Sequence, residues 1–68
     1  SEISNLRLDL RKALQKLSQR QREIIVLRFL ADLPEQAVAD FLNINIGTVK
    51  STTHDALARL KSMVEVSP

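Results

Sequence analysis

Most of the side chains that could do chemistry lie in one short segment, residues 45–55. They offer amide, hydroxyl, ammonium, imidazole and carboxylate groups, in the order Asn45, Thr48, Lys50, Ser51, Thr52, Thr53, His54 and Asp55. Threonine and serine hydroxyls can hydrogen-bond to base edges or to phosphates, and a lysine can neutralise a phosphate. This combination of side chains indicates contact with a nucleic acid.

His54 and Asp55 are the pair in this segment that most resembles part of a catalytic site. Consecutive residues of a helix point in different directions, so these two are not expected to act as a base and its orienting acid. The chain has no cysteine, one histidine and one glycine, which leaves no zinc-ligand set and no glycine-rich phosphate loop. We therefore expect no enzyme activity, no cofactor and no metal.

A helix that begins near residue 46 would divide the segment between two faces. Successive residues turn by about 100°, and the apolar side chains then centre about 20° from Val49. The opposite face and its flanks carry the DNA-contacting residues that we predict: Gly47, Thr48, Lys50, Ser51, Thr52, His54 and Asp55. Amide groups of the first turn can also receive a phosphate oxygen. The alternative is that this face is only a solvated surface.

The residues just before this helix favour DNA contact over a merely solvated face. Asn43 stands where a left-handed backbone is needed to end the preceding helix, and asparagine accepts that conformation next best after glycine. Asn45 is placed to cap the start of the following helix. A helix, a tight turn and a second helix form the motif that inserts a helix end into the DNA major groove.

Apolar residues at helical spacing predict four helices, over about residues 3–17, 19–31, 34–42 and 46–64. Ser18 and Gln21 form a capping box ahead of the second helix, and Pro34 suits the first turn of the third. The second helix is apolar on most sides and is expected to be the most buried. The fold class that we predict is all-α, one domain over residues 1–68 with a C-terminal helix-turn-helix. Its expected centre is Ile24, Leu27, Val38, Phe41, Val49, Leu57 and Leu60.

Length and charge limit the possible classes further. The longest uninterrupted apolar run is four residues, so we expect no membrane span, and the absence of cysteine fits the cytoplasm. The chain begins with Ser1 and lacks an initiating Met, and we expect it to be a fragment or a processed form. The net charge is +2, made of +3 in residues 1–32 and −1 in residues 33–68. Because phosphate attraction supplies most non-specific DNA affinity, we expect weak DNA binding by the domain alone.

Three stretches resemble the C-terminal domain, region four, of bacterial RNA polymerase sigma factors of the extracytoplasmic-function (ECF) group. They are Leu17-Ser18-Gln19-Arg20-Gln21-Arg22-Glu23-Ile24-Ile25-Val26-Leu27-Arg28-Phe29, Val38-Ala39-Asp40-Phe41-Leu42 and Gly47-Thr48-Val49-Lys50-Ser51. The resemblance covers roughly residues 14–60. It implies a four-helix domain that reads the promoter −35 element with its last helix. It also implies docking on the flap of the polymerase beta subunit, sequestration by an anti-sigma factor, and a monomer when isolated, in the cytoplasm at the nucleoid.

The chain departs from the pattern of that family at three positions. Thr52 and Asp55 stand where the family commonly has arginines, and Ala37 stands where it often has glutamate. The first two changes remove positive charge from the predicted DNA face. A carboxylate at residue 55 repels phosphates but can also accept a hydrogen bond from cytosine N4, and we favour simple repulsion.

Two other functions remain open from the sequence. The DNA-binding output domain of a response regulator shares the Leu-Ser and Arg-Glu pattern of the second helix and the Thr-Val-Lys string. The amphipathic residues 1–16 and the Gly47 and Lys50-Ser51 positions favour a sigma domain instead. The second alternative is a mainly protein-binding, anti-sigma-binding module, which Asp55 and the low charge support.

Overall fold

The computed structural model describes the backbone of residues 10–65 and the side chains of residues 10–63. A first helix is described over residues 10–16, and it is followed by α2 (Gln19–Ile25), η1 (Val26–Leu30), α3 (Glu35–Leu42) and α4 (Ile46–Glu65). The described part of the chain is helical and contains no strand, which confirms the all-α fold class. The predicted start of the first helix at residue 3 lies outside the described residues.

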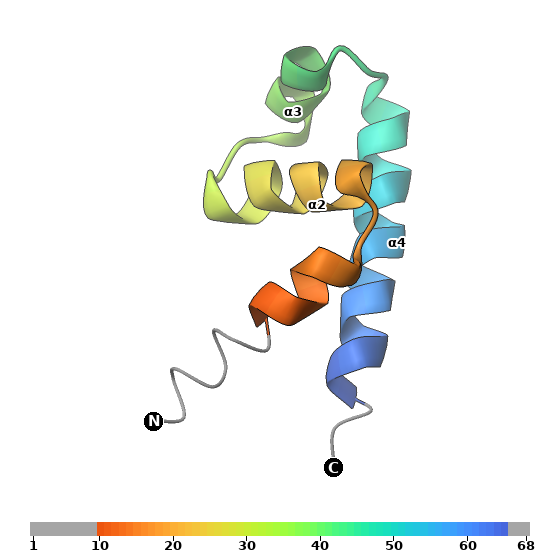
Figure 1. The fold of residues 1–68 in the computed structure, drawn as a ribbon. Coiled ribbons are helices and arrows are strands. Elements are labelled where there is room, and N and C mark those ends of the chain that lie inside the picture. The colour runs from red at the N-terminus through yellow and green to blue at the C-terminus, as the bar shows by residue number, and fades with distance from the viewer. Residues whose placement is uncertain (1–9, 66–68) are drawn as a thin grey trace.

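Helix α4 is the longest described helix, and the shorter helices lie along one side of it (Figure 1). Both α2 and α3 pack against α4. The first helix lies nearer the C-terminal half of α4, and α3 lies beside its N-terminal half. The side of α4 turned away from these helices is therefore left open.

The start of α2 is fixed by a reciprocal pair of local hydrogen bonds. The backbone N–H of Gln21 donates to Ser18 Oγ at 3.2 Å, and the backbone N–H of Ser18 donates to Gln21 Oε1 at 3.1 Å. This confirms the capping box predicted from the sequence. The two bonds satisfy amide donors that an uncapped helix would leave without partners.

The second helix, predicted over about residues 19–31, is helical over residues 19–30, but it is not an α-helix throughout. After Ile25 the helix continues as the π-helical turn η1. The Ala31 N–H at its end donates a hydrogen bond to the Val26 carbonyl at 2.9 Å. Asp32 then adopts a left-handed backbone with φ 57°. The Arg28 Nη1 donates to the Leu33 carbonyl at 2.6 Å and so ties the connecting loop to η1. No turn signal in the sequence marks this change of helix type.

Pro34 lies one residue outside α3, not in its first turn as predicted. It is the N-cap residue, with φ −68° and an extended ψ of 159°, and the helix begins at Glu35. Its carbonyl accepts the first hydrogen bond of the helix, from the Val38 N–H at 3.1 Å. The proline ring permits this φ in either position, so the sequence alone could not separate the two.

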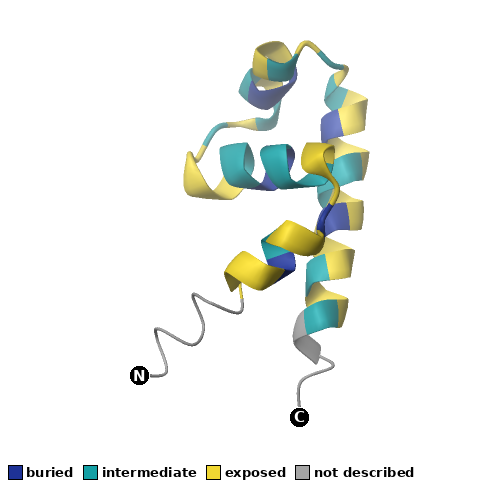
Figure 2. Ribbon diagram, in the orientation of Figure 1, coloured by how far each residue is buried: buried dark blue, intermediate teal, exposed yellow. Residues whose placement is uncertain are grey.

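The core consists of two small clusters that both include α4. The first joins α2, α3 and α4 through Ile24, Val38, Ala39 and Val49, with the partly buried Leu27, Leu33, Leu42, Ile44 and Ile46 around it. The second joins Leu17, which directly follows the first helix, to Ile25 of α2 and Ala56 of α4, with the partly buried Leu14, Leu60 and Met63 around them. Figure 2 shows the buried residues of α4 on the side that meets the other helices.

The prediction that Phe41 and Leu57 belong to the core is wrong. Phe41 is 72% exposed and Leu57 is 43% exposed. In α3 the buried stripe is Val38, Ala39 and Leu42, and Phe41 lies about 100° around the helix from its middle. In α4 the buried position next to Leu57 belongs to Ala56.

The second helix, which the sequence predicts to be the most buried element, is covered along α2 but not at its C-terminal end. Ile24 and Ile25 are buried, but Phe29 and Leu30 at its end are 50% and 67% exposed. The other described elements cover only one side of it.

Candidate nucleic-acid interface

The turn between α3 and α4 is closed by asparagines, as the sequence predicts. Asn43 ends α3 with φ 56° and ψ 49°, the left-handed conformation. The Ile44 N–H donates to the Ala39 carbonyl at 3.0 Å and satisfies an end carbonyl of α3. This left-handed residue reverses the chain within three residues, so α4 begins close to where α3 ends.

Asn45 caps α4 through both its side chain and its backbone, which confirms the predicted N-cap. Its Oδ1 accepts a 2.7 Å hydrogen bond from the Gly47 N–H. Its backbone carbonyl accepts from the N–H groups of Thr48 and Val49 at 3.0 and 3.2 Å. The Gly47 amide therefore already has a partner, so the first turn offers fewer amides to a phosphate than the sequence suggested.

The rotation of α4 presents most of the predicted DNA-contacting residues to solvent. Val49 and Ala56 are fully buried and turn the helix so that its other side faces outward. The exposed residues of this part of α4 include Gly47, Thr48, Lys50, Ser51, His54 and Asp55. Figure 2 shows exposed positions along the outward side of α4. Thr52 is half-buried and lies at the edge of this surface. We call these seven residues the α4 face.

Two hydroxyl groups near the α4 face are bonded to the helix itself. Ser51 Oγ donates to the Thr48 carbonyl at 3.3 Å, and Thr53 Oγ1 donates to the Val49 carbonyl at 2.7 Å. A serine bonded in this way still presents oxygen lone pairs outward. Ser51 can therefore accept a hydrogen bond from a base in this geometry, and it can donate one after a rotation of its hydroxyl.

The His54 and Asp55 side chains come close to each other, although consecutive residues of a helix point in different directions. The His54 Nδ1 lies 3.5 Å from the Asp55 Oδ1, and the two side chains are 85% and 71% exposed. At this distance the contact is at the outer limit of a hydrogen bond. The α4 face thus carries one lysine, one carboxylate and one imidazole, and no concentration of positive charge.

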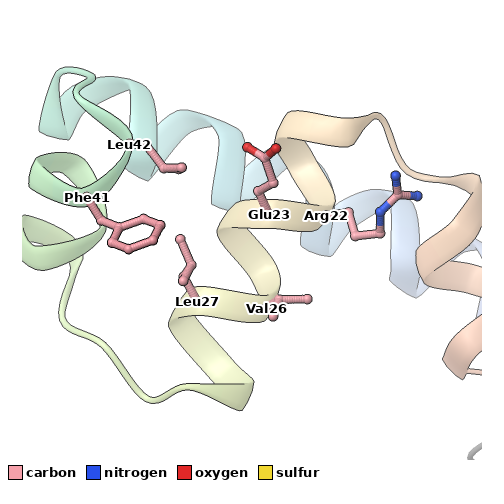
Figure 3. A pocket seen from close by; sticks show the side chains of 6 residues that line it. All are labelled: Arg22, Glu23, Val26, Leu27, Phe41 and Leu42. Carbon is pink, nitrogen blue, oxygen red and sulfur yellow. The ribbon is translucent and has the colours of Figure 1, made fainter.

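A second surface is an apolar groove between α2–η1 and α3. It has a volume of about 450 Å³ and is lined by Arg22, Glu23, Val26, Leu27, Phe41 and Leu42. In Figure 3 the Phe41 ring and the Leu27 side chain point toward each other across it. The sequence did hold a signal: the second helix is apolar on more sides than a chain of 68 residues can cover.

Within the described residues, no helix combines the length and the apolar character needed to cross a membrane.

Residues 7–60 match the family described as Sigma-70, region 4. The chain is 42% identical over 53 residues to an RNA polymerase sigma-E factor of Streptomyces antibioticus. The aligned region covers 78% of this chain and 29% of that protein. It is 44% identical over 48 residues to an RNA polymerase sigma-E factor of Streptomyces coelicolor, or 71% of this chain and 27% of that protein. The chain therefore spans less than a third of these relatives. No solved structure is a significant match.

Proposed function

Since this chain belongs to the sigma-70 region 4 family, we propose that it is the promoter-reading domain of an ECF sigma factor. In this role α4 lies in the major groove of the promoter −35 element, and the domain docks on the flap of the polymerase beta subunit during transcription initiation. These are functions of a longer protein, of which the chain is the region-four part. The role also assigns the protein to the bacterial cytoplasm, at the nucleoid.

The observation that carries this proposal is the Asn45-capped start of α4 beside an open helix face. Helix-turn-helix domains present the N-terminal residues of their second helix to base edges. Gly47 has no side chain and lets the helix backbone approach the groove floor. Thr48 and Ser51 are exposed and can contact bases or phosphates, and Lys50 can neutralise a phosphate. His54, Asp55 and Thr52 extend or flank this contact.

The lack of a net positive charge on the α4 face favours action within a polymerase complex. Lys50 is opposed by Asp55 on the same face, and residues 33–68 carry a net charge of −1. Few phosphates can then be neutralised by the domain itself, and non-specific affinity is expected to be low. A docked polymerase raises the effective concentration of the domain at the promoter without any new DNA contact.

We propose that the polymerase flap binds in the groove between α2–η1 and α3. The groove is apolar, and Phe41 on its wall is 72% exposed, a surface suited to an apolar partner segment. Residues 1–32, which include α2 and η1, carry the +3 charge. An anti-sigma factor that covered the same groove would compete with the polymerase. In the absence of either partner we expect a monomer.

The DNA part of this proposal is tested by selecting duplexes from a pool with about ten randomised base pairs, using the 68-residue chain at low salt. The wild-type chain should enrich one motif, and Ser51→Ala should alter the preference at one position of it. Ser62→Ala is the matched control, because Ser62 is an exposed serine far along the same helix. Identical motifs from wild type and Ser51→Ala would contradict base contact by Ser51.

The docking part is tested by amide hydrogen exchange of the chain with purified polymerase core. Protection is expected over residues 19–30 and 35–42, and Phe41→Ala should weaken it. Leu57→Ala is the control, since Leu57 is an exposed apolar residue outside the groove. Protection confined to residues 46–62 would contradict docking at the groove.

The groove also supports the second candidate, a mainly protein-binding module with little DNA contact. The two candidates differ in the selection experiment, because such a module would enrich no motif while still binding polymerase or an anti-sigma factor. The response-regulator alternative has weaker support, because the family match over residues 7–60 favours a sigma domain.

A further inference from the structure

Asp55 is an exposed carboxylate whose position the fold itself does not explain. It lies in the middle of the 20-residue helix α4, far from the helix start, where a negative charge would stabilise the helix dipole. It is 71% exposed, so it fills no space in the core. Arg59 stands four residues later, at the spacing of a helix ion pair. Among the described residues, however, the charged contact recorded for Asp55 is with His54 alone.

The α4 face brings Asp55 next to residues that meet DNA in the proposed function. Asp55 lies one turn beyond Ser51 and about 40° around the helix from it. Its Oδ1 is 3.5 Å from the His54 Nδ1, which leaves Oδ2 without a recorded partner among the described residues. The nearest lysine on this face, Lys50, is on the opposite flank of the helix. A base edge that reached this turn would therefore meet a carboxylate oxygen.

An ionised carboxylate can only accept hydrogen bonds. In the major groove the available donors are the amino groups of cytosine N4 and adenine N6, whereas guanine and thymine present acceptors or a methyl group. The sequence alone favours simple repulsion at residue 55. Because the structure leaves Asp55 71% exposed, with Oδ1 at 3.5 Å from the His54 Nδ1, and resting on the proposed function, we propose instead that Asp55 is a specificity-determining residue. It selects cytosine or adenine, on a fixed strand, at the base pair opposite the third turn of α4. Its charge also repels phosphates, which lowers binding to all sequences and raises the ratio of specific to non-specific affinity.

The test repeats the selection from randomised duplexes with the 68-residue chain at about 50 mM salt, where phosphate contacts bind most strongly. Wild type should enrich cytosine or adenine on one strand at one position of its motif. Asp55→Ala should lose this preference at that position alone. The ratio of affinities for the preferred and the other bases should fall there about ten-fold. Asp55→Asn should move it to adenine, because an asparagine can pair with both N6 and N7. Asp32→Asn makes the same chemical change at an exposed loop residue with a left-handed backbone, and it should change nothing.

Three other results would overturn the assignment, and they differ in what they say of the proposed function. If Asp55→Ala strengthens binding to every sequence but leaves all base preferences as in wild type, Asp55 only repels phosphates. If neither Asp55 variant changes affinity or motif, residue 55 does not face DNA. In both cases DNA reading by α4 stands as long as Ser51→Ala still alters the motif. If the wild-type chain enriches no motif at low salt, the specificity role and the DNA-reading function fail together.

Discussion

Gly47 and Asn45 fit closely at the start of α4: the Gly47 N–H donates to Asn45 Oδ1 at 2.7 Å, and a Cβ at residue 47 would lie 3.1 Å from the same oxygen. Gly47 does not have a positive φ, so glycine is not needed there for its backbone freedom. It fits because it has no Cβ to crowd Asn45 Oδ1. The same lack of a side chain leaves the first turn of the α4 face open to a base or phosphate. The cap that orients α4 and the surface proposed to meet DNA thus share one residue.

Asn45→Ala should destabilise the domain by about 1 kcal/mol, because the Gly47 amide would lose its side-chain partner. Asn45→Asp keeps an accepting oxygen at the same place and should stay close to wild type. Urea unfolding followed by circular dichroism measures both changes. Equal unfolding midpoints for wild type and Asn45→Ala would mean that the side-chain cap does not stabilise α4 in solution.

Gly47→Ala should change stability by less than about 1 kcal/mol in either direction. Alanine favours a helix by about 1 kcal/mol over glycine, but its Cβ crowds Asn45 Oδ1 and loosens a cap of similar value. DNA affinity should nevertheless fall, since the added methyl stands on the α4 face. The comparison needs urea unfolding and a duplex-binding titration on the same variant. If Gly47→Ala raised the free energy of unfolding by the full helix preference of about 1 kcal/mol, the Asn45 side chain would move aside at no cost.

Asn43→Gly should leave stability unchanged or raise it slightly, because glycine adopts the left-handed backbone at φ 56° more easily. Asn43→Val should destabilise by about 1–2 kcal/mol, since a β-branched side chain is strained there. Thermal and urea unfolding of the two variants give the comparison. If the valine variant unfolds at the wild-type midpoint, the turn adopts another backbone in solution.

Ile24 and Phe41 should differ in how much truncation to alanine destabilises the domain, although both are large apolar residues. Ile24 is fully buried, and Ile24→Ala should cost about 2–5 kcal/mol. Phe41 is 72% exposed on the groove wall, so Phe41→Ala should cost less than about 1 kcal/mol. Urea unfolding decides between them. A larger loss for Phe41→Ala would show that its ring is covered in the free protein.

Lys50→Ala should weaken binding to all duplexes similarly and reduce the slope of log affinity against log salt by about 0.9, the value of one phosphate contact. The salt titration uses one selected and one scrambled duplex. Lys12→Ala removes an exposed lysine from the first helix and serves as the control. An unchanged slope would mean that Lys50 contacts no phosphate.

The features that the sequence predicted correctly are those made by residues a few positions apart. Asn43 and Asn45 at the turn, and Ser18 with Gln21 at the start of α2, each depend on backbone groups within about five residues. Their side chains therefore carry the necessary information without knowledge of the rest of the fold. The order of the helices and the all-α class follow from the same local periodicity.

The tertiary structure decided which side of each helix is covered. A chain of 68 residues has more apolar surface than its own elements can bury, and no local pattern says which part stays open. Packing on α4 covered Ile24 and Val38 and left Phe41 exposed beside a groove. It also decided that residues 26–30 form a π-helical turn. The burial of Val49 and Ala56 likewise fixed the rotation of α4, and with it the outward direction of Ser51, His54 and Asp55.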